Sequence, residues 1–160
     1  MSSSIAIASG KGGVGKTTIA VNLSLTLCQM GSKVSLMDAD FGLANAHILL
    51  GINPKRTIRD LLKNELPLED IIETGPSGLK FISGGNGLID ILNIEKNSKY
   101  QLIRALDPIQ KNTDYLLVDI PAGASDNSMT FASAVDKLII VLVSEPTSFM
   151  DAYTFIKTAN

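Results

Sequence analysis

Cysteine and aromatic residues are scarce in this sequence of 160 residues. The single cysteine, Cys28, cannot form a disulfide within the chain. Its neighbours Leu25, Leu27 and Met30 predict a small core residue of a helix rather than a reactive thiol. With no tryptophan, three tyrosines and five phenylalanines, the chain offers few aromatic faces on which single-stranded nucleic acid could stack. The scarcity of cysteine fits a reducing compartment.

The sequence also lacks an excess of charge of one sign and a long apolar run. Its 14 basic and 16 acidic residues are interspersed and give a formal net charge of −2, so a general affinity for nucleic acid is not expected. No apolar run approaches the roughly 18 residues of a membrane-spanning helix, and no basic export signal follows Met1. We therefore expect one cytoplasmic nucleotide-binding domain over residues 1–160, large enough to bury its own core.

A glycine-rich stretch follows the first apolar run, residues 5–8. From Gly10 it fits the P-loop pattern G-x-x-x-x-G-K-[S/T], in which backbone N–H groups and a helix N-terminus surround phosphate oxygens. Lys16 would reach the terminal phosphates, and the Thr17 hydroxyl would bind magnesium. The glycines would allow positive φ angles and close backbone approach. Those glycines are Gly10, Gly12, Gly13 and Gly15.

The same glycines also fit a competing pattern. Gly10, Gly12 and Gly15 read G-x-G-x-x-G, the dinucleotide fingerprint, and Asp38 follows near the distance at which an acid would bind the ribose. Spacing alone therefore leaves a dehydrogenase open. The Lys16-Thr17 pair favours a triphosphate with magnesium, because a pyrophosphate bridge needs neither that cation nor that hydroxyl.

Acidic residues follow two of the predicted strands. Asp38 and Asp40 end the strand that begins at Lys33, and Asp119 ends the apolar run from Tyr115, which fits a Walker B strand. We expect Asp119 to hold a magnesium-bound water, and the loop 120–124 to lie near the γ-phosphate. The alternative for the first pair is that one acid caps the next helix and the other is solvated.

The remaining patterns alternate between strands and helices. His47 has no visible metal partner, so we expect a packed or surface histidine. Gly84–Gly87 lacks a following lysine and hydroxyl, so we expect a strand-to-helix connection there. The alternation predicts an α/β fold with a doubly wound, mostly parallel sheet flanked by helices. The expected helices are 18–30, 44–50, a short one that begins after Thr57, a short one at 68–72, a longer one at 100–111 and one that begins at Phe149. The expected strands are 5–8, 33–38, 79–83, 115–119 and 138–143.

An additional lysine, Lys11, precedes the usual one in the loop. Together with the acids at 38, 40 and 119, it makes the sequence resemble the deviant Walker A ATPases of the MinD/ParA family, from about Ser4 to the end. The match is greatest with the MinD-like flagellar number regulators, known as FlhG or FleN. The segments that carry this finer resemblance are 40–45, 48–51, 83–85, 145–148 and 151–153.

The resemblance implies a cycle driven by ATP and Mg²⁺. A monomer binds ATP, two monomers close face to face, and hydrolysis, stimulated by a protein partner, reopens them. Lys11 would reach the phosphates of the opposite subunit, with Asp151 as a candidate partner, and Asp40 would position the attacking water. The catalytic set would be Lys11, Lys16 and Asp40; the metal set Thr17, Asp38 and Asp119; and the nucleotide set Gly10, Lys11, Gly12, Gly13, Val14, Gly15, Lys16, Thr17 and Thr18.

Family members are generally longer than this chain and carry base-recognition segments and a C-terminal amphipathic helix beyond the part matched here. Adenine specificity and peripheral contact with the inner face of the cell membrane are therefore expected from segments that this sequence does not contain. Two further functions stay open at this point. One is a ParA-like chromosome or plasmid partitioning ATPase, and the other is an iron–sulfur carrier scaffold.

Overall fold

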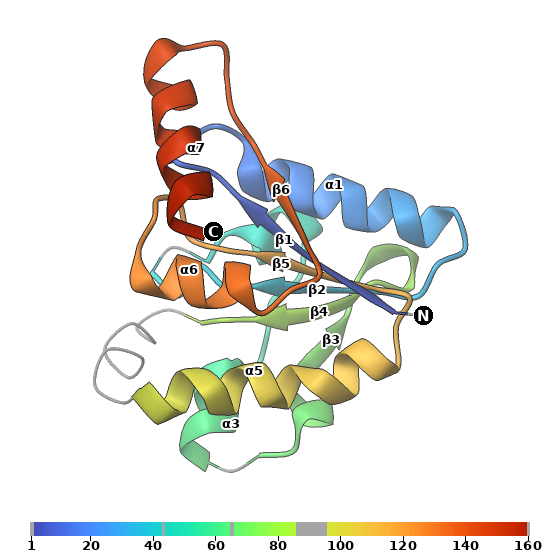
Figure 1. Cartoon of the computed structure of the whole chain (residues 1–160). Helices are drawn as coiled ribbons and strands as arrows, with labels where there is room; N and C mark the ends of the chain where they lie inside the picture. The colour runs from blue at the N-terminus through green and yellow to red at the C-terminus, as the bar shows by residue number, and fades with distance from the viewer. Residues whose placement is uncertain (1, 43, 65, 86–95, 160) are drawn as a thin grey trace.

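A computed structural model describes residues 2–42, 44–64, 66–85 and 96–159 (Figure 1). Six strands form one sheet in the order β3-β4-β2-β5-β1-β6. Every neighbouring pair is parallel except β3 and β4. The expected doubly wound, mostly parallel α/β domain is confirmed. The strands are β1 Ser3–Ala8, β2 Val34–Asp38, β3 Ile72–Thr74, β4 Lys80–Ser83, β5 Tyr115–Asp119 and β6 Lys137–Ile140.

Successive residues of the central strands belong to two different apolar clusters. In β1, for example, Ala6 and Ala8 pack into one cluster while Ile7 packs into the other. Because side chains alternate between the faces of a strand, the two clusters lie on opposite faces of the sheet. Both faces are therefore buried, as is usual for parallel sheets.

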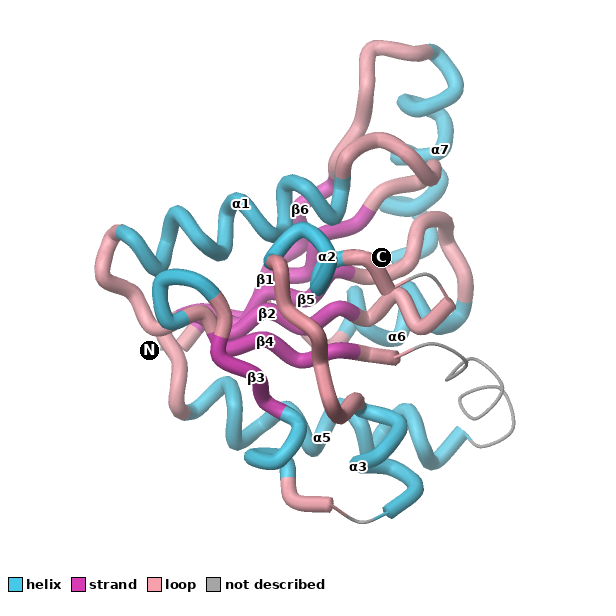
Figure 2. The backbone as a smooth tube through the Cα atoms, turned by 180° about the vertical axis from the view of Figure 1, so that it is seen from behind, coloured by secondary structure: helices cyan, strands magenta, loops and turns pink. Residues whose placement is uncertain are grey.

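Helices cover both faces. In Figure 1, α1 lies on one face and α3 and α5 on the other; Figure 2 shows α2 beside α1. α7 lies at the β6 edge of the sheet, where Phe155 packs into the same apolar cluster as buried residues of α3 and α5. None of the described helices is long and apolar enough to cross a membrane. The helices are α1 Lys16–Gln29, α2 Ala46–Leu50, α3 Ile58–Asn64, α5 Lys96–Lys111, α6 Asp126–Ser133 and α7 Pro146–Ala159, with short 3₁₀ turns at Leu68–Ile71 and Pro76–Gly78.

Two predictions of secondary structure were wrong. The helix expected at 68–72 is a 3₁₀ turn followed by β3, which pairs antiparallel with β4, so the strict alternation of strand and helix is interrupted. Helix α6 was not predicted, because its sequence is mostly polar; its N-cap Ser125 accepts a hydrogen bond from the N–H of Ser128. Both elements are short, and tertiary pairing decides their structure.

The other differences concern boundaries. β6 ends at Ile140 rather than Val143, α5 begins at Lys96 rather than Tyr100, and α7 begins at Pro146 rather than Phe149. At the start of α3, the N–H of Thr57 donates to the Asp60 carboxylate at 2.8 Å, as in a capping box. The connection expected at 84–87 falls partly outside the described residues.

Candidate nucleotide site

The glycine loop connects β1 to the first turn of α1. Gly13 and Gly15 have φ angles of 78° and 88°, a left-handed conformation that favours glycine. Gly15 is also the N-cap of α1 and supplies no capping side chain. The N–H groups of the first helical turn therefore have no side-chain cap and can bind an anion.

The first two glycines have other roles than the expected positive φ. A Cβ on Gly10 would lie 2.4 Å from the carbonyl carbon of Asp151, so Gly10 allows α7 to pack directly against the loop. Gly12 does not have a positive φ, and no neighbouring heavy atom of the described residues lies within 4 Å of the position that a Cβ would occupy there. The positive φ predicted for the four glycines is thus confirmed at Gly13 and Gly15 and not found at Gly10 and Gly12, and the close contact at Gly10 is with α7.

Lys16 makes a buried ion pair. Its Nζ donates to Oδ1 of Asp119 at 2.6 Å, and the two side chains are 8% and 0% exposed. The second oxygen of Asp119, Oδ2, is buried and has no hydrogen-bond partner among the described residues. A buried carboxylate oxygen without a partner is uncommon, and a bound cation or its water would satisfy it.

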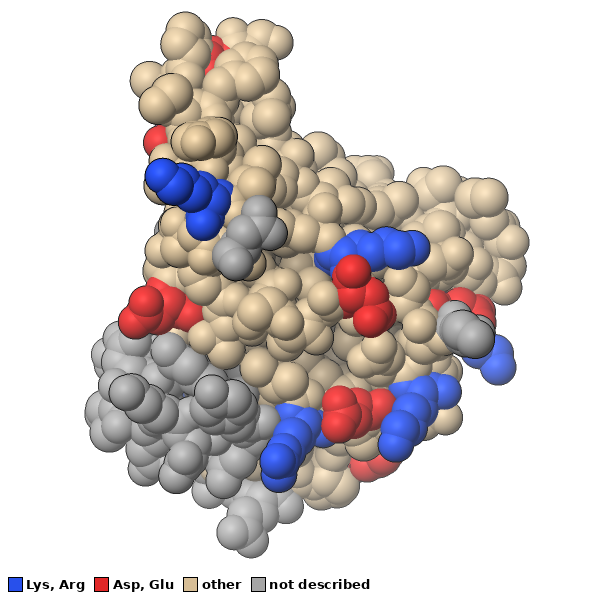
Figure 3. Space-filling model, in the orientation of Figure 1, with Lys and Arg blue, Asp and Glu red and all other residues tan. Residues whose placement is uncertain are grey.

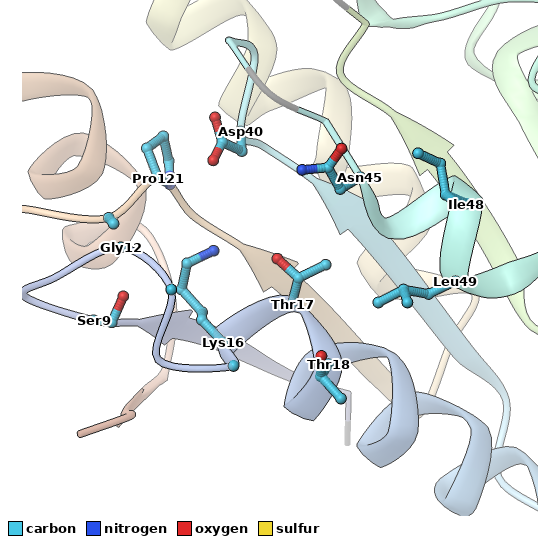
Figure 4. Close-up of a pocket in the computed structure, with 13 residues that line it drawn as sticks. Ser9, Gly12, Lys16, Thr17, Thr18, Asp40, Asn45, Ile48, Leu49 and Pro121 are labelled. Atoms are coloured by element: carbon cyan, nitrogen blue, oxygen red, sulfur yellow. The ribbon is translucent and has the colours of Figure 1, made fainter. Parts of the chain in front are cut away.

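A cleft of about 740 Å³ opens beside the loop (Figure 4). Lys16 and Thr17 lie on one side of it, and Asp40, Asn45 and the α2 residues lie on the other. The loop after β5 closes a further side and is tied to the glycine loop, because the N–H of Gly123 donates to the carbonyl of Ser9 at 2.9 Å. The lining residues are Ser9, Gly12, Gly13, Gly15, Lys16, Thr17, Thr18, Asp40, Asn45, Ile48, Leu49, Pro121 and Ala122.

Asp38 lies at the end of β2, only 1% exposed, and does not line the cleft. Its Oδ1 accepts the N–H of Asp40 at 3.2 Å, and its Oδ2 accepts the N–H of Ala46 at 3.0 Å. Burial raises the pKa of Asp38 to about 6; the N–H of Ala46 opposes this rise, whereas the neighbouring charges of Asp119 and Asp40 add to it. The alternative in which one acid caps the following helix thus has structural support.

Lys11 lies outside the cleft lining and pairs with a residue that was not expected as its partner. Its Nζ is 3.0 Å from Oε2 of Glu145, with side chains 47% and 56% exposed. The candidate partner Asp151 instead packs its backbone over Gly10. In this structure the partner of Lys11 is therefore Glu145, on the loop between β6 and α7.

The structure brings together most of the predicted site residues. Gly12, Gly13, Gly15, Lys16, Thr17, Thr18 and Asp40 all line the cleft. Asp119 does not line the cleft but contacts Lys16, which does. Val14 packs against the core on the α1 face. The predicted sets omitted Asn45, Ile48, Leu49 and Glu145. No spacing rule marks them, although all four lie in the segments 40–45, 48–51 and 145–148 that carry the finer family resemblance.

Comparisons with known proteins agree with this geometry. A family model for ParA, described as NUBPL iron-transfer P-loop NTPase, matches residues 1–158. The antiactivator FleN of Pseudomonas aeruginosa is 41% identical over 98% of this chain and 56% of its own length. The flagellum site-determining protein YlxH of Helicobacter pylori is 37% identical over 96% of this chain and 52% of its own.

Solved structures share the fold as well. The septum site-determining protein MinD of Pyrococcus horikoshii OT3, complexed with Mg-ADP, superposes with a TM-score of 0.84 at 30% identity, over 99% of this chain and 66% of that one. The chain thus spans a little over half the length of the two curated relatives and slightly less than two thirds of the MinD chain.

Proposed function

This chain belongs to the MinD/ParA family of P-loop NTPases, and from this premise we propose that it binds ATP with Mg²⁺ and acts as a slowly hydrolysing molecular switch. One observation carries the proposal. A cleft of about 740 Å³ has the glycine loop, here called the phosphate loop, on one side and an acidic residue, Asp40, on another. The buried Lys16–Asp119 pair lies beneath the loop. The loop and Lys16 suit a negatively charged phosphate chain, and Asp40 suits a water molecule. These are the two reactants of ATP hydrolysis.

Each wall has a separate task in this proposal. The N–H groups of the glycine loop and of the first turn of α1 bind phosphate oxygens, and Lys16 adds a cation at the terminal phosphates. Thr17 and Asp119 would hold the metal, and the partnerless Oδ2 of Asp119 fits that role. When bound, magnesium neutralises charge on the phosphate oxygens. Asp40, across the cleft, accepts a hydrogen bond from the attacking water and orients it.

Lys11 would act on a second subunit. Its pair with Glu145 is half exposed, and exposed ion pairs contribute only about 0–1 kcal/mol, so leaving Glu145 is energetically easy. In an ATP-dependent homodimer, Lys11 would contact the phosphates bound by the other subunit, as an arginine finger does in other systems. The Lys11–Glu145 pair would then belong to the monomer alone.

The biological role is inferred from the names of the relatives. One of them is a flagellum site-determining protein, so we propose that this switch sets the placement or number of a cellular assembly such as the flagellum. A protein partner that stimulates hydrolysis, and membrane contact through a helix beyond residue 160, are predictions for the whole protein.

Two other functions have less support. The family description mentions iron transfer, but protein iron–sulfur clusters are held by several cysteines and this sequence has only Cys28. A partitioning ATPase would need a basic surface for DNA, whereas basic and acidic side chains are interspersed on the face shown in Figure 3. We therefore favour the switch.

Nucleotide binding tests the proposal directly. Fluorescent ATP should bind the wild-type chain in the presence of Mg²⁺, and Lys16→Ala should abolish binding while far-UV circular dichroism shows a folded protein. Lys11→Ala is the matched control, because it removes a lysine of the same loop that lies outside the cleft lining. Absence of ATP binding by the wild-type chain would contradict the proposed function, and equal loss in both variants would contradict the separate roles of the two lysines.

A further inference from the structure

Asp38 connects two segments that form one side of the cleft. Its two carboxylate oxygens accept the N–H groups of Asp40 and Ala46, at 3.2 and 3.0 Å. Ala46 is the first residue of α2, and the side chain of the N-cap residue, Asn45, makes no capping hydrogen bond. The carboxylate of Asp38 therefore does for α2 what an N-cap side chain usually does.

The anchored segments carry side chains that line the cleft. Asp40 and Asn45 lie between the two hydrogen bonds, and Ile48 and Leu49 follow on α2. Because α2 has only five residues, its own hydrogen bonds are too few to hold it in place. The position of this side of the cleft therefore depends on contacts from outside the helix, and the Asp38 carboxylate is one of them.

Neighbouring residues fix Asp38 itself. The N–H of Ala39 donates to the carbonyl of Asp119 at 2.8 Å, which ties the end of β2 to β5. Gly84 lies so close that a built Cβ would be 2.5 Å from the carbonyl oxygen of Asp38. Phe41 is buried, with its ring centroid 5.8 Å from that of Phe131. The anchor thus starts from a rigid place in the sheet.

Asp38 and Asp119 differ in what their oxygens can still bind. Both oxygens of Asp38 hold backbone N–H groups. Neither acid is among the residues that line the cleft, so the difference between them lies in these hydrogen bonds. Asp119 keeps one buried oxygen without a partner among the described residues. Each oxygen of Asp38 already accepts one N–H and has only one lone pair left for a cation, whereas Oδ2 of Asp119 has both lone pairs available, so Asp119 is the better ligand.

We propose that Asp38 is a positioning residue that fastens the Asp40 segment and α2 to the end of β2, and that it does not bind the metal itself. The proposal rests on the proposed function, since it takes Asp40 as the residue that orients water. It replaces the role in the metal set that the family resemblance implied for Asp38. Loss of the anchor displaces Asp40, so hydrolysis slows while Mg-nucleotide binding persists.

Asp38→Asn is the main test variant, because it keeps the shape but replaces one acceptor oxygen with an NH₂ donor. Single-turnover hydrolysis by the full chain should fall about tenfold or more, and the Mg²⁺ concentration needed to bind fluorescent ATP should stay within about threefold of wild type. Asp119→Asn should instead raise that Mg²⁺ requirement about tenfold or more. An increase of that size in Asp38→Asn would overturn the proposal.

Amide hydrogen exchange of the nucleotide-free chain gives a second readout that does not depend on hydrolysis. Exchange should become faster at Asp40 or Ala46 in Asp38→Asn, and at both in Asp38→Ala. Asp60→Asn is the matched control, since Asp60 accepts the N–H of Thr57 in the same manner at α3. It should change exchange near Thr57 and leave hydrolysis unaffected.

Unchanged exchange at both Asp40 and Ala46 in the Asp38 variants would also overturn the proposal. The two failures can be told apart. If the wild-type chain does not bind ATP, the proposed function fails, and the exchange measurement still tests the anchor. If it binds and hydrolyses ATP but Asp38→Asn alters only the Mg²⁺ requirement, the positioning role alone fails.

Discussion

The two lysines of the phosphate loop occupy opposite environments. Lys16 is buried beneath the loop with its ammonium on Asp119, whereas Lys11 is half exposed at the rim with its ammonium on Glu145. Both make ion pairs within 3.0 Å, so distance alone does not separate them. Burial does, because solvent weakens an exposed pair and its loss leaves both charges hydrated.

This difference supports the proposal that the loop serves two nucleotides. A lysine held in the interior is positioned in advance for the phosphates that enter its own cleft. A lysine at the rim can exchange a weak partner for a stronger one outside the monomer. We infer that Lys16 belongs to the monomer's own site and Lys11 to the interface with a second subunit.

The largest effect should come from removing the buried lysine. Lys16→Met leaves Asp119 buried without its cation, and breaking a buried pair in this way costs about 3–5 kcal/mol. Urea unfolding of the nucleotide-free chain should show this loss, while Lys11→Met should change the free energy of unfolding by under about 1 kcal/mol. Equal losses in the two variants would remove the contrast between the lysines.

An intermediate effect should appear in the pH dependence of stability. Asp38 has its pKa raised from 3.8 to about 6, so the folded state binds its proton more tightly than the unfolded state does. Above pH 6 the charged carboxylate lowers the free energy of unfolding by its full desolvation cost. This cost disappears as the pH falls toward 4 and the carboxylate takes up its proton.

The wild-type chain should therefore gain unfolding free energy relative to Asp38→Asn, on the order of 3 kcal/mol, between pH 7 and pH 4. Paired urea titrations of the two proteins at several pH values measure this difference. If the unfolding free energy of the wild type instead falls relative to that of Asp38→Asn on acidification, the surroundings favour the charged form of Asp38. That result would contradict the effect expected from burial of this group.

The smallest effect should be the coupling between Lys11 and Glu145. A double-mutant cycle with Lys11→Met and Glu145→Gln should give a coupling of under about 1 kcal/mol, because both side chains are about half exposed. The coupling should decrease further near 1 M salt, where the Debye length is only about 3 Å. A coupling of about 3 kcal/mol that resists salt would place Lys11 in the same class as Lys16.

The sequence was sufficient to predict the fold class and most of the residues that line the candidate cleft. Local patterns identify Lys16, Thr17 and Asp119, because a P-loop and a Walker B strand are contiguous stretches. The partners of these residues were not predictable in the same way. Lys16 pairs with Asp119 and Lys11 with Glu145 across more than one hundred residues, and those contacts depend on how strands and loops are arranged in space.

Asp38 shows the same limit at shorter range. The family resemblance implied a metal role for Asp38, but the side-chain direction and the path of the following loop place its oxygens against backbone N–H groups. Spacing indicates which residues share an edge of the sheet. It does not indicate which of their oxygens are already occupied.

The assignment of two lysines to two nucleotides is tested most directly by the molar mass of Lys11→Ala in ATP and in ADP, measured by light scattering during gel filtration of the full-length protein. We predict that Lys11→Ala binds ATP with near wild-type affinity but stays monomeric, whereas the wild-type protein dimerises in ATP and not in ADP. A Lys11→Ala protein that dimerises in ATP as the wild type does, or that loses ATP binding as Lys16→Ala should, would contradict the assignment.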